Sequence, residues 1–261
     1  MRLRRLLFNK YSISVLILLL LLSTDIMLHK GMTRVMMPSG FSEFPVSTTT
    51  PCHHSINTSS KEWLKAINTI EKRNSIESLS GIESDVYFDK EKMEFFVYHD
   101  SSRISELTLD SLLYEHTMIS AIWLDVKNLS GENKMAALSK LEEIRSAFNK
   151  PILVESPDAA SLKPFCENGY ATIVYAPFFN PYTEEESAIK HFAETMINDM
   201  AANPASAVSG YYFQYPFLKH SFPNYPVLTW SEKHTASAIS YLLNRQLQND
   251  SAVRIILYEQ D

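Results

Sequence analysis

Two acidic side chains and a histidine, spaced so that they can share one site, are the residues of this chain best suited to chemistry. Glu83 and Asp85 stand two positions apart in the strand-forming run 81–89. Side chains alternate faces along a strand, so both carboxylates point the same way. A second apolar run, 95–98, leads to His99, and a hairpin of the two runs would bring the imidazole beside the carboxylates. The alternative is an exposed hairpin whose acids are solvated.

A third carboxylate and a lysine follow the next apolar run. Asp125 comes after residues 121–124, and Lys127, two positions later, shares its face of the strand. Together with Glu83 and Asp85, Asp125 offers the hard oxygen ligands that Mg²⁺ and Ca²⁺ prefer. We therefore expect one divalent cation, Mg²⁺ in preference to Ca²⁺, with the ammonium of Lys127 available to a phosphate. The alternative for Asp125 and Lys127 is an exposed ion pair.

The histidines His54 and His99 supply groups that titrate near neutral pH. Two imidazoles beside a cation can act as general base and general acid, one deprotonating a nucleophile and the other protonating a leaving oxygen. With a lysine and a cation they suit the charge and the proton transfers of a phosphodiester reaction. The predicted catalytic pair is therefore His54 and His99, although a surface loop is the alternative for His54, which follows Pro51 and His53.

The elements that must position these residues alternate between strand and helix. Strands are predicted at 81–89, 95–98, 121–127, 151–155, 171–174, 208–213, 226–230 and 253–258, with a first one leading into His54; helices are predicted at 61–73, 108–115, 134–148, 158–168, 184–201 and 231–246. Such alternation implies parallel strands with helical crossovers, and about eight of them predict an α/β fold, a closed (β/α)₈ TIM barrel.

Active sites of this fold lie at the carboxyl ends of the strands. Polar residues that end the predicted strands are His54, Asn57, Glu83, Asp85, Asp125, Lys127 and Glu155. They would converge on one rim of the barrel. For Glu155, a turn that caps the next helix is the alternative.

The N-terminus is the one compositional anomaly of the 261 residues. A basic segment precedes the apolar run 12–22, which addresses the chain to a membrane. Because no small-residue cleavage site follows, we expect residues 1–30 to be an uncleaved signal anchor in preference to a cleaved signal peptide. The domain is then exported to a periplasmic, extracellular or lumenal space, or secreted if the signal is cleaved.

The remaining organisation is a linker and one domain. Residues 31–50, rich in Met, Pro, Ser and Thr, predict a linker, and 51–261 the barrel domain. A net charge of −6 argues against nucleic acid as a partner. Nothing in the sequence brings Cys52 and Cys166 together, so their pairing stays open.

Four ordered motifs resemble those of the PLC-like phosphodiesterase superfamily, which includes glycerophosphodiester phosphodiesterases and sphingomyelinase D-like phospholipases. These motifs are His54-Ser-Ile-Asn57, Gly81-Ile-Glu83-Ser-Asp85-Val86, His99-Asp100 and Leu124-Asp125-Val-Lys127. Their spacing is also similar to that of the menorin branch. The resemblance covers residues 52–158.

The resemblance implies a TIM barrel in which Glu83, Asp85 and Asp125 hold one cation while His54 and His99 exchange protons. It implies phosphate contacts from Lys127 and Asn57. Apart from the resemblance, Trp230 at the end of the predicted strand 226–230 is a candidate to stack on a head group, although its position favours buried packing. The H-R-G and E-N-T motifs of glycerophosphodiesterases are absent, so a glycerophosphodiester, a lysophospholipid and a phosphoglycan all stay open as substrates.

The expected function is thus that of a metal-dependent phosphodiesterase, a phosphoric diester hydrolase or a phosphodiester-cyclising lyase. A non-catalytic membrane-tethered barrel that binds or assembles is the alternative from another class. A sugar-processing barrel with Glu83 and Glu155 as paired carboxylates would leave Asp85 and both histidines without a role.

Overall fold

The computed structural model describes residues 10–38, 40–52, 56, 58–99, 105–114 and 117–259 of the chain. Four residues of the sequence motifs, His54, Ser55, Asn57 and Asp100, lie outside the described residues.

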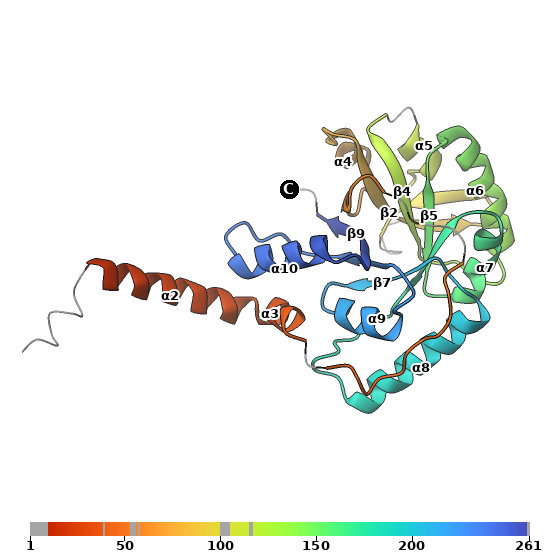
Figure 1. Ribbon diagram of the computed structural model, residues 1–261. Helices are drawn as coiled ribbons and strands as arrows, with labels where there is room; N and C mark the ends of the chain where they lie inside the picture. The colour runs from red at the N-terminus through yellow and green to blue at the C-terminus, as the bar shows by residue number, and fades with distance from the viewer. Residues whose placement is uncertain are drawn as a thin grey trace, which may run out of the picture.

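Eight parallel strands close into a barrel (Figure 1). They are β1 (Glu62–Leu64), β2 (Ser80–Asp89), β4 (Ile119–Val126), β5 (Ile152–Ser156), β6 (Ala171–Tyr175), β7 (Ala207–Tyr211), β8 (Val227–Trp230) and β9 (Val253–Tyr258). β1 pairs with both β9 and β2, which closes the ring, and β3 (Glu94–Val97) adds an antiparallel arm to β2. The predicted (β/α)₈ barrel is confirmed.

The helices that alternate with these strands along the chain surround the barrel. In the described residues they are α4 (Ile70–Asn74), α5 (Leu109–Leu113), α6 (Lys134–Phe148), α7 (Ala159–Glu167), α8 (Glu186–Ala202), α9 (Tyr215–Ser221) and α10 (Ala238–Asn249). The predicted helix 134–148 matches α6. The helix predicted at 231–246 instead begins at Ala238, because the hydroxyl of Ser237 accepts from the backbone N–H of Ser240 and caps it there.

Two apolar layers hold the barrel together. Alternate strand side chains fill its interior, where Trp63, Trp123 and Leu257 are buried. The other faces of the strands pack against the helices in a larger outer core. Gly81 belongs to the inner layer, where the indole of Trp63 lies against its α-carbon.

The start of the barrel differs from the prediction. The expected helix 61–73 is wrong: residues 62–64 form β1, and only Ile70–Asn74 is helical. The ring between β2 and β9 needs a strand to close it, and backbone pairing there overrides the helical spacing of the apolar residues. The first barrel strand therefore follows position 54, so the expected strand leading into His54 is also wrong.

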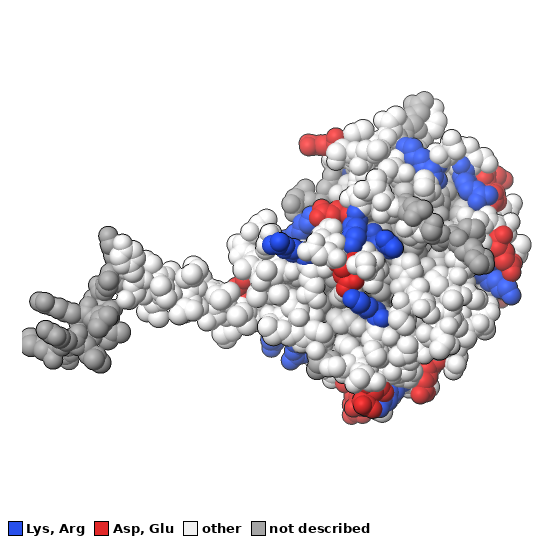
Figure 2. Space-filling view, in the orientation of Figure 1, with Lys and Arg blue, Asp and Glu red and all other residues white. Residues whose placement is uncertain are grey.

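An apolar helix, α2 (Lys10–Leu28), projects from the barrel as a stalk (Figures 1 and 2). Within it, residues 11–28 have a mean hydropathy of 2.1, and the length and composition of this stretch are those of a membrane-crossing helix. The short helix α3 (Lys30–Met36) follows and turns back onto the barrel.

The segment 31–50, expected as a linker, packs against the barrel. Met32 and Val35 are buried in the outer core, and Phe41 packs edge-on against Phe217 of α9. Further along, the backbone N–H of Ser47 donates to the carbonyl of Ser221 at 2.7 Å. We call residues 40–52 the strap, because this segment runs across the outside of the barrel (Figure 1).

A disulfide fastens the end of the strap. Cys52 is bonded to Cys166 of α7, which answers the pairing question that the sequence left open. The backbone N–H of Cys52 also donates to the carbonyl of Ala205, just before β7.

Candidate active site

The register of three neighbouring strands lines up the acidic residues. Asp85 of β2 is the partner of Asp125 of β4, and Asp125 is the partner of Glu155 of β5. Parallel strands in register put these side chains in one layer at the carboxyl end of the barrel. Glu83 stands two residues before Asp85 and therefore points into the same interior.

Three of these carboxylates converge. One oxygen atom from each of Glu83, Asp85 and Asp125 lies within 4.8 Å of the others. Glu83 and Asp85 are buried, with only 5% and 3% of their surface exposed. Buried carboxylates this close repel one another unless a positive charge lies between them. The predicted ligand set is therefore brought together.

Lys127 supplies part of that positive charge. Its Nζ lies 2.6 Å from Oδ1 of Asp85 and also contacts Oδ2 of Asp125. Burial opposes the charged form of Lys127, but these two carboxylates outweigh it and hold its pKa above the ordinary value. The exposed ion pair considered from the sequence is thus replaced by a partly buried bridge inside the site.

The positive charge of Lys127 alone does not neutralise the buried carboxylates of this site. Burial, followed by the charge of Asp85, raises the pKa of Glu83 to about 8. Burial also raises the pKa of Asp125, although Lys127 lies against it, and raises that of Glu155 well above its usual range. Excess buried negative charge on hard oxygen donors is what a divalent cation neutralises, so Glu83, Asp85 and Asp125 fit such an ion.

The loop after β1 orients two of the three ligands, which the sequence did not reveal. Asn68 donates from Nδ2 to Oδ2 of Asp85 at 2.6 Å, and its Oδ1 accepts from the backbone N–H of the same residue at 2.9 Å. The backbone N–H of Ala66, in a left-handed conformation with φ 54°, donates to Oε2 of Glu83 at 2.7 Å. In the sequence, the only sign of this loop was the amide side chain of Asn68, and it lay inside the segment 61–73 that was predicted as a helix.

His99 stands at the mouth of the site. It follows β3, whose antiparallel register places Val97 opposite Val86, so the chain returns toward the level of the carboxylates. The side chain is exposed and lines a cavity of about 440 Å³ together with Glu83, Asp85 and Asp125. His99 thus lines the same cavity as the two carboxylates of β2, and its predicted catalytic role stays a prediction.

Three aromatic rings form the wall across from the carboxylates in the same cavity. Tyr175, Tyr211 and Trp230 end β6, β7 and β8. The rings of Tyr175 and Trp230 stack with centroids 5.7 Å apart, and Tyr211 meets Trp230 edge-on at 4.6 Å. Trp230 is only partly buried, so its ring is available to a bound group.

Glu155 occupies the position between the cation ligands and this wall. It is buried, and one of its oxygens accepts from the hydroxyl of Ser209 on β7. Its side chain thus points into the barrel cavity and does not cap the following helix, whose capping carboxylate belongs to Asp158.

His54 and Asn57 lie outside the described residues, so the structure does not place them. Of their described neighbours, Cys52 donates its backbone N–H to the carbonyl of Ala205, which precedes β7, and Ile56 belongs to the inner core. The predicted role of His54 stays a prediction.

No family model and no curated protein matches the chain. Among solved structures it is similar to a candidate glycerophosphodiester phosphodiesterase from Galdieria sulphuraria, with 14% identity and a TM-score of 0.42 over 69% of this chain and 80% of that one. It is also similar to a glycerophosphoryl diester phosphodiesterase from Parabacteroides distasonis, at 11% identity and a TM-score of 0.43 over 78% and 85% of the two chains. A calcium-dependent phosphoinositol-specific phospholipase C from a Pseudomonas species has 8% identity and a TM-score of 0.42 over 82% and 91%.

Proposed function

We propose that the chain is a cation-dependent phosphodiesterase, anchored in a membrane by α2 with its barrel exported. The observation that carries the proposal is the convergence of Glu83, Asp85 and Asp125 at the carboxyl end of the barrel, within 4.8 Å of one another. Lys127 and His99 share their cavity. A phosphodiester suits a site that combines hard cation ligands, a fixed ammonium and an imidazole.

The cation, when bound to the three carboxylates, supplies a Lewis acid for a phosphoryl oxygen. Lys127 holds a positive charge beside Asp85 and Asp125, where a second phosphoryl oxygen can bind. His99 at the mouth exchanges a proton with the attacking or the leaving oxygen. The rings of Tyr175, Tyr211 and Trp230 pack against the group esterified to the phosphate.

Two routes fit these residues. Either water attacks phosphorus, or a hydroxyl of the substrate next to the phosphate attacks and closes a ring. In both routes one ester P–O bond breaks, and the alcohol that leaves takes up a proton. The compound bis(p-nitrophenyl) phosphate has no such hydroxyl, so its turnover reports the water route alone. Glycerophosphodiesters, lysophospholipids and phosphoglycans, analysed by ³¹P NMR, report both routes, because a cyclic product has its own phosphorus resonance.

The test uses the full chain in detergent, with EDTA and then with Mg²⁺ or Ca²⁺ added back. We expect chelation to abolish turnover and one of the two cations to restore it. Asp125→Asn should lower kcat/KM at least about 100-fold, and His99→Ala about 10²- to 10⁴-fold, the usual contribution of a positioned proton-transfer group. His191→Ala, which removes an exposed histidine on α8, is the matched control and should leave turnover unchanged.

His54→Ala tests the second half of the predicted histidine pair in the same assay. A loss as large as that of His99→Ala would support the two-histidine mechanism. Full activity of His54→Ala would limit the proton transfer to His99. Absence of turnover on every substrate, with the cation still bound in calorimetry, would favour the binding or assembly protein instead.

Export of the barrel is supported by two features. The stretch 11–28 is apolar enough to cross a membrane, and Cys52 and Cys166 form a disulfide, a bond typical of oxidising compartments outside the cytosol. Alkylation of intact cells followed by reduction tests this: both thiols should be protected until a reductant is added.

A further inference from the structure

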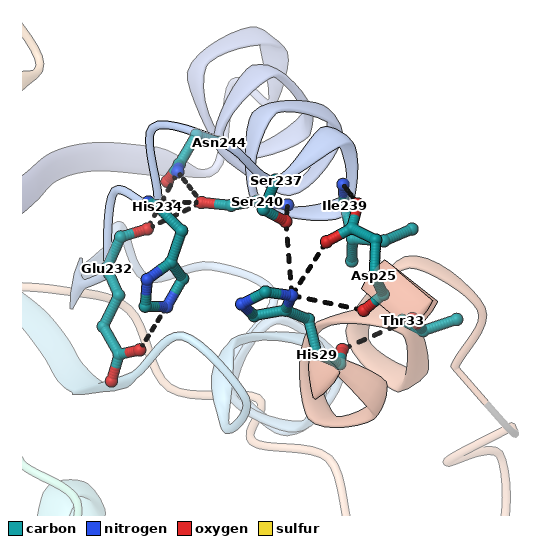
Figure 3. Close-up of polar contacts among 9 residues, drawn as sticks. All are labelled: Asp25, His29, Thr33, Glu232, His234, Ser237, Ile239, Ser240 and Asn244. Atoms are coloured by element: carbon teal, nitrogen blue, oxygen red, sulfur yellow. Dashed lines mark hydrogen bonds and ion pairs between the residues drawn. The ribbon is translucent and has the colours of Figure 1, made fainter. Parts of the chain in front are cut away.

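Hydrogen bonds join the C-terminal end of α2, the proposed membrane anchor, to the start of α10 (Figure 3). Asp25, in the last turns of α2, accepts from the backbone N–H of Ile239 at 3.0 Å. His29 lies 2.8 Å from the other carboxylate oxygen of Asp25 and 3.4 Å from the hydroxyl of Ser237. The ring of His29 lies 4.7 Å from that of His234. The anchor therefore caps the start of α10 and is fixed to it.

The length of the apolar run places this junction at the membrane surface. About 14 residues of the span precede Asp25, which corresponds to about 21 Å of helix. A hydrocarbon core of about 30 Å therefore also needs the turn that contains Asp25 and continues to Leu28. That turn is the part of α2 that contacts α10, so the start of α10 lies at the edge of the hydrocarbon core, where the acyl chains meet the lipid head groups.

The outward face of α10 has the composition that this depth favours. Exposed residues recur at helical spacing along it: Ala238, Tyr241, Leu242, Arg245 and Asn249. Tyr241 is 63% exposed and Leu242 is 44% exposed, next to the end that Asp25 caps, and Arg245 lies one turn further. Tyrosine and leucine beside a basic residue are typical of side chains at the membrane interface.

A second hollow leads from the candidate active site toward this junction. Its volume is about 310 Å³, and it shares Lys65, Tyr211, Trp230 and Glu259 with the cavity that contains the carboxylates. Its remaining lining includes Glu232 and His234, whose side chains are hydrogen-bonded to each other. The ring of His234 lies beside that of His29. The open side of the catalytic cavity thus reaches the loop that holds the anchor.

We propose that the outward face of α10, centred on Tyr241 and Leu242, lies in the lipid interface of the membrane that α2 crosses. The occupant of this apolar face is the bilayer, because the face begins at the end of α10 that Asp25 and His29 hold against the apolar helix α2. The barrel is then held in one orientation, with the second hollow next to the head groups. This inference rests on the anchoring by α2 in the proposed function, but not on the reaction.

The experiment measures contact with lipid directly. The full chain is placed in phosphatidylcholine nanodiscs with or without bromine on the acyl chains near the head groups, and Tyr241→Trp is compared with Tyr114→Trp. Tyr114, at the end of α5, is 68% exposed and is the matched control. The emission added by Tyr241→Trp should fall by at least about half in brominated lipid, as expected for a ring within the interface. The emission added by Tyr114→Trp should not change.

Equal emission of Tyr241→Trp in the two lipids would overturn the proposal, and so would failure of the chain to enter nanodiscs. A dimer that buries Tyr241 away from lipid would give the first of these results. The second readout is turnover: Tyr241→Ser with Leu242→Ser should raise the apparent KM for a phosphodiester in vesicles about tenfold, from the lost apolar contact, and leave bis(p-nitrophenyl) phosphate unaffected. Quenching without any turnover would retain the lipid contact and reject only the proposed reaction.

Discussion

Asn68 orients Asp85, one of the proposed cation ligands, without carrying a charge. Its amide donates to the carboxylate of Asp85 and accepts both from the backbone of Asp85 and from the hydroxyl of Ser84. Such fixed partners restrict a ligand to the conformation that binds the ion, and they commonly contribute a 10- to 100-fold factor in affinity.

Asn68→Ala should therefore weaken cation binding about 10-fold or more, and lower turnover at limiting cation by a similar factor. Titration calorimetry with Mg²⁺ and Ca²⁺ measures the first effect. Asn74→Ala, at the exposed end of α4, is the control and should bind the cation normally. Equal affinity of both variants would contradict the positioning role of Asn68.

Gly81 is required by the packing of the barrel interior. A methyl group added at its α-carbon would come within 2.1 Å of the indole of Trp63, a ring that is itself 3% exposed and enclosed by other side chains. A fully enclosed ring cannot move aside without disturbing its neighbours.

Gly81→Ala should lower the free energy of unfolding by about 2–3 kcal/mol, the cost of overpacking a filled core. Urea unfolding followed by circular dichroism measures it. Gly131→Ala is the matched control, because no atom lies within 4 Å of the methyl group that it would add. A change of less than about 0.5 kcal/mol at both positions would show that the interior can rearrange.

At the scale of elements, Asp250 joins α9 to the turn before β9. Its carboxylate accepts from Lys219 and from the hydroxyl of Tyr215, both on α9, and from the backbone N–H of Ala252 at 2.9 Å. Burial raises the pKa of Asp250, but these hydrogen bonds outweigh it and leave the pKa below its ordinary value. The carboxylate is therefore more stable in the folded chain than in the unfolded one.

Because the folded-state pKa is lowered, Asp250 stabilises the fold at pH values above its unfolded pKa of about 4, and this contribution is lost as the pH falls through the lower folded pKa. Asp250→Asn should cost about 1–2 kcal/mol at pH 7 and less at about pH 3. Urea midpoints at the two pH values measure the difference. Asp199→Asn, exposed on α8, should behave as the parent chain at both.

At the scale of the whole molecule, the disulfide ties the N-terminal strap to the middle of the barrel. Cys52 and Cys166 are 114 positions apart, so the bond closes a loop that contains β1 to β5 and most of α7. A cross-link that closes a long loop restricts the unfolded chain strongly and stabilises the fold mainly for that reason.

Reduction of the full chain, or Cys52→Ser with Cys166→Ser, should lower the free energy of unfolding by about 2–4 kcal/mol. Thermal unfolding with and without a reductant measures it, and the double variant should no longer respond to the reductant. If the reductant still lowered the Tm of the double variant, the effect would come from another source.

The sequence by itself determined much of the fold and the chemistry of the candidate site. Two-residue spacing placed Glu83 with Asp85 and Asp125 with Lys127, because strand side chains alternate faces. Alternating strands and helices predicted the barrel, since parallel strands need helical crossovers and their carboxyl ends meet at one rim. These properties depend on neighbours along the chain, which a sequence records directly.

The tertiary structure alone decided the rest. Residues 62–64 form a strand because ring closure provides partners on both sides, which their own helical spacing did not indicate. Asn68, the Cys52–Cys166 bond and the contact of Asp25 with α10 each join positions far apart in sequence or hidden within a misassigned element. Such contacts arise from the packing of distant segments, and local periodicity carries no information about which segments meet.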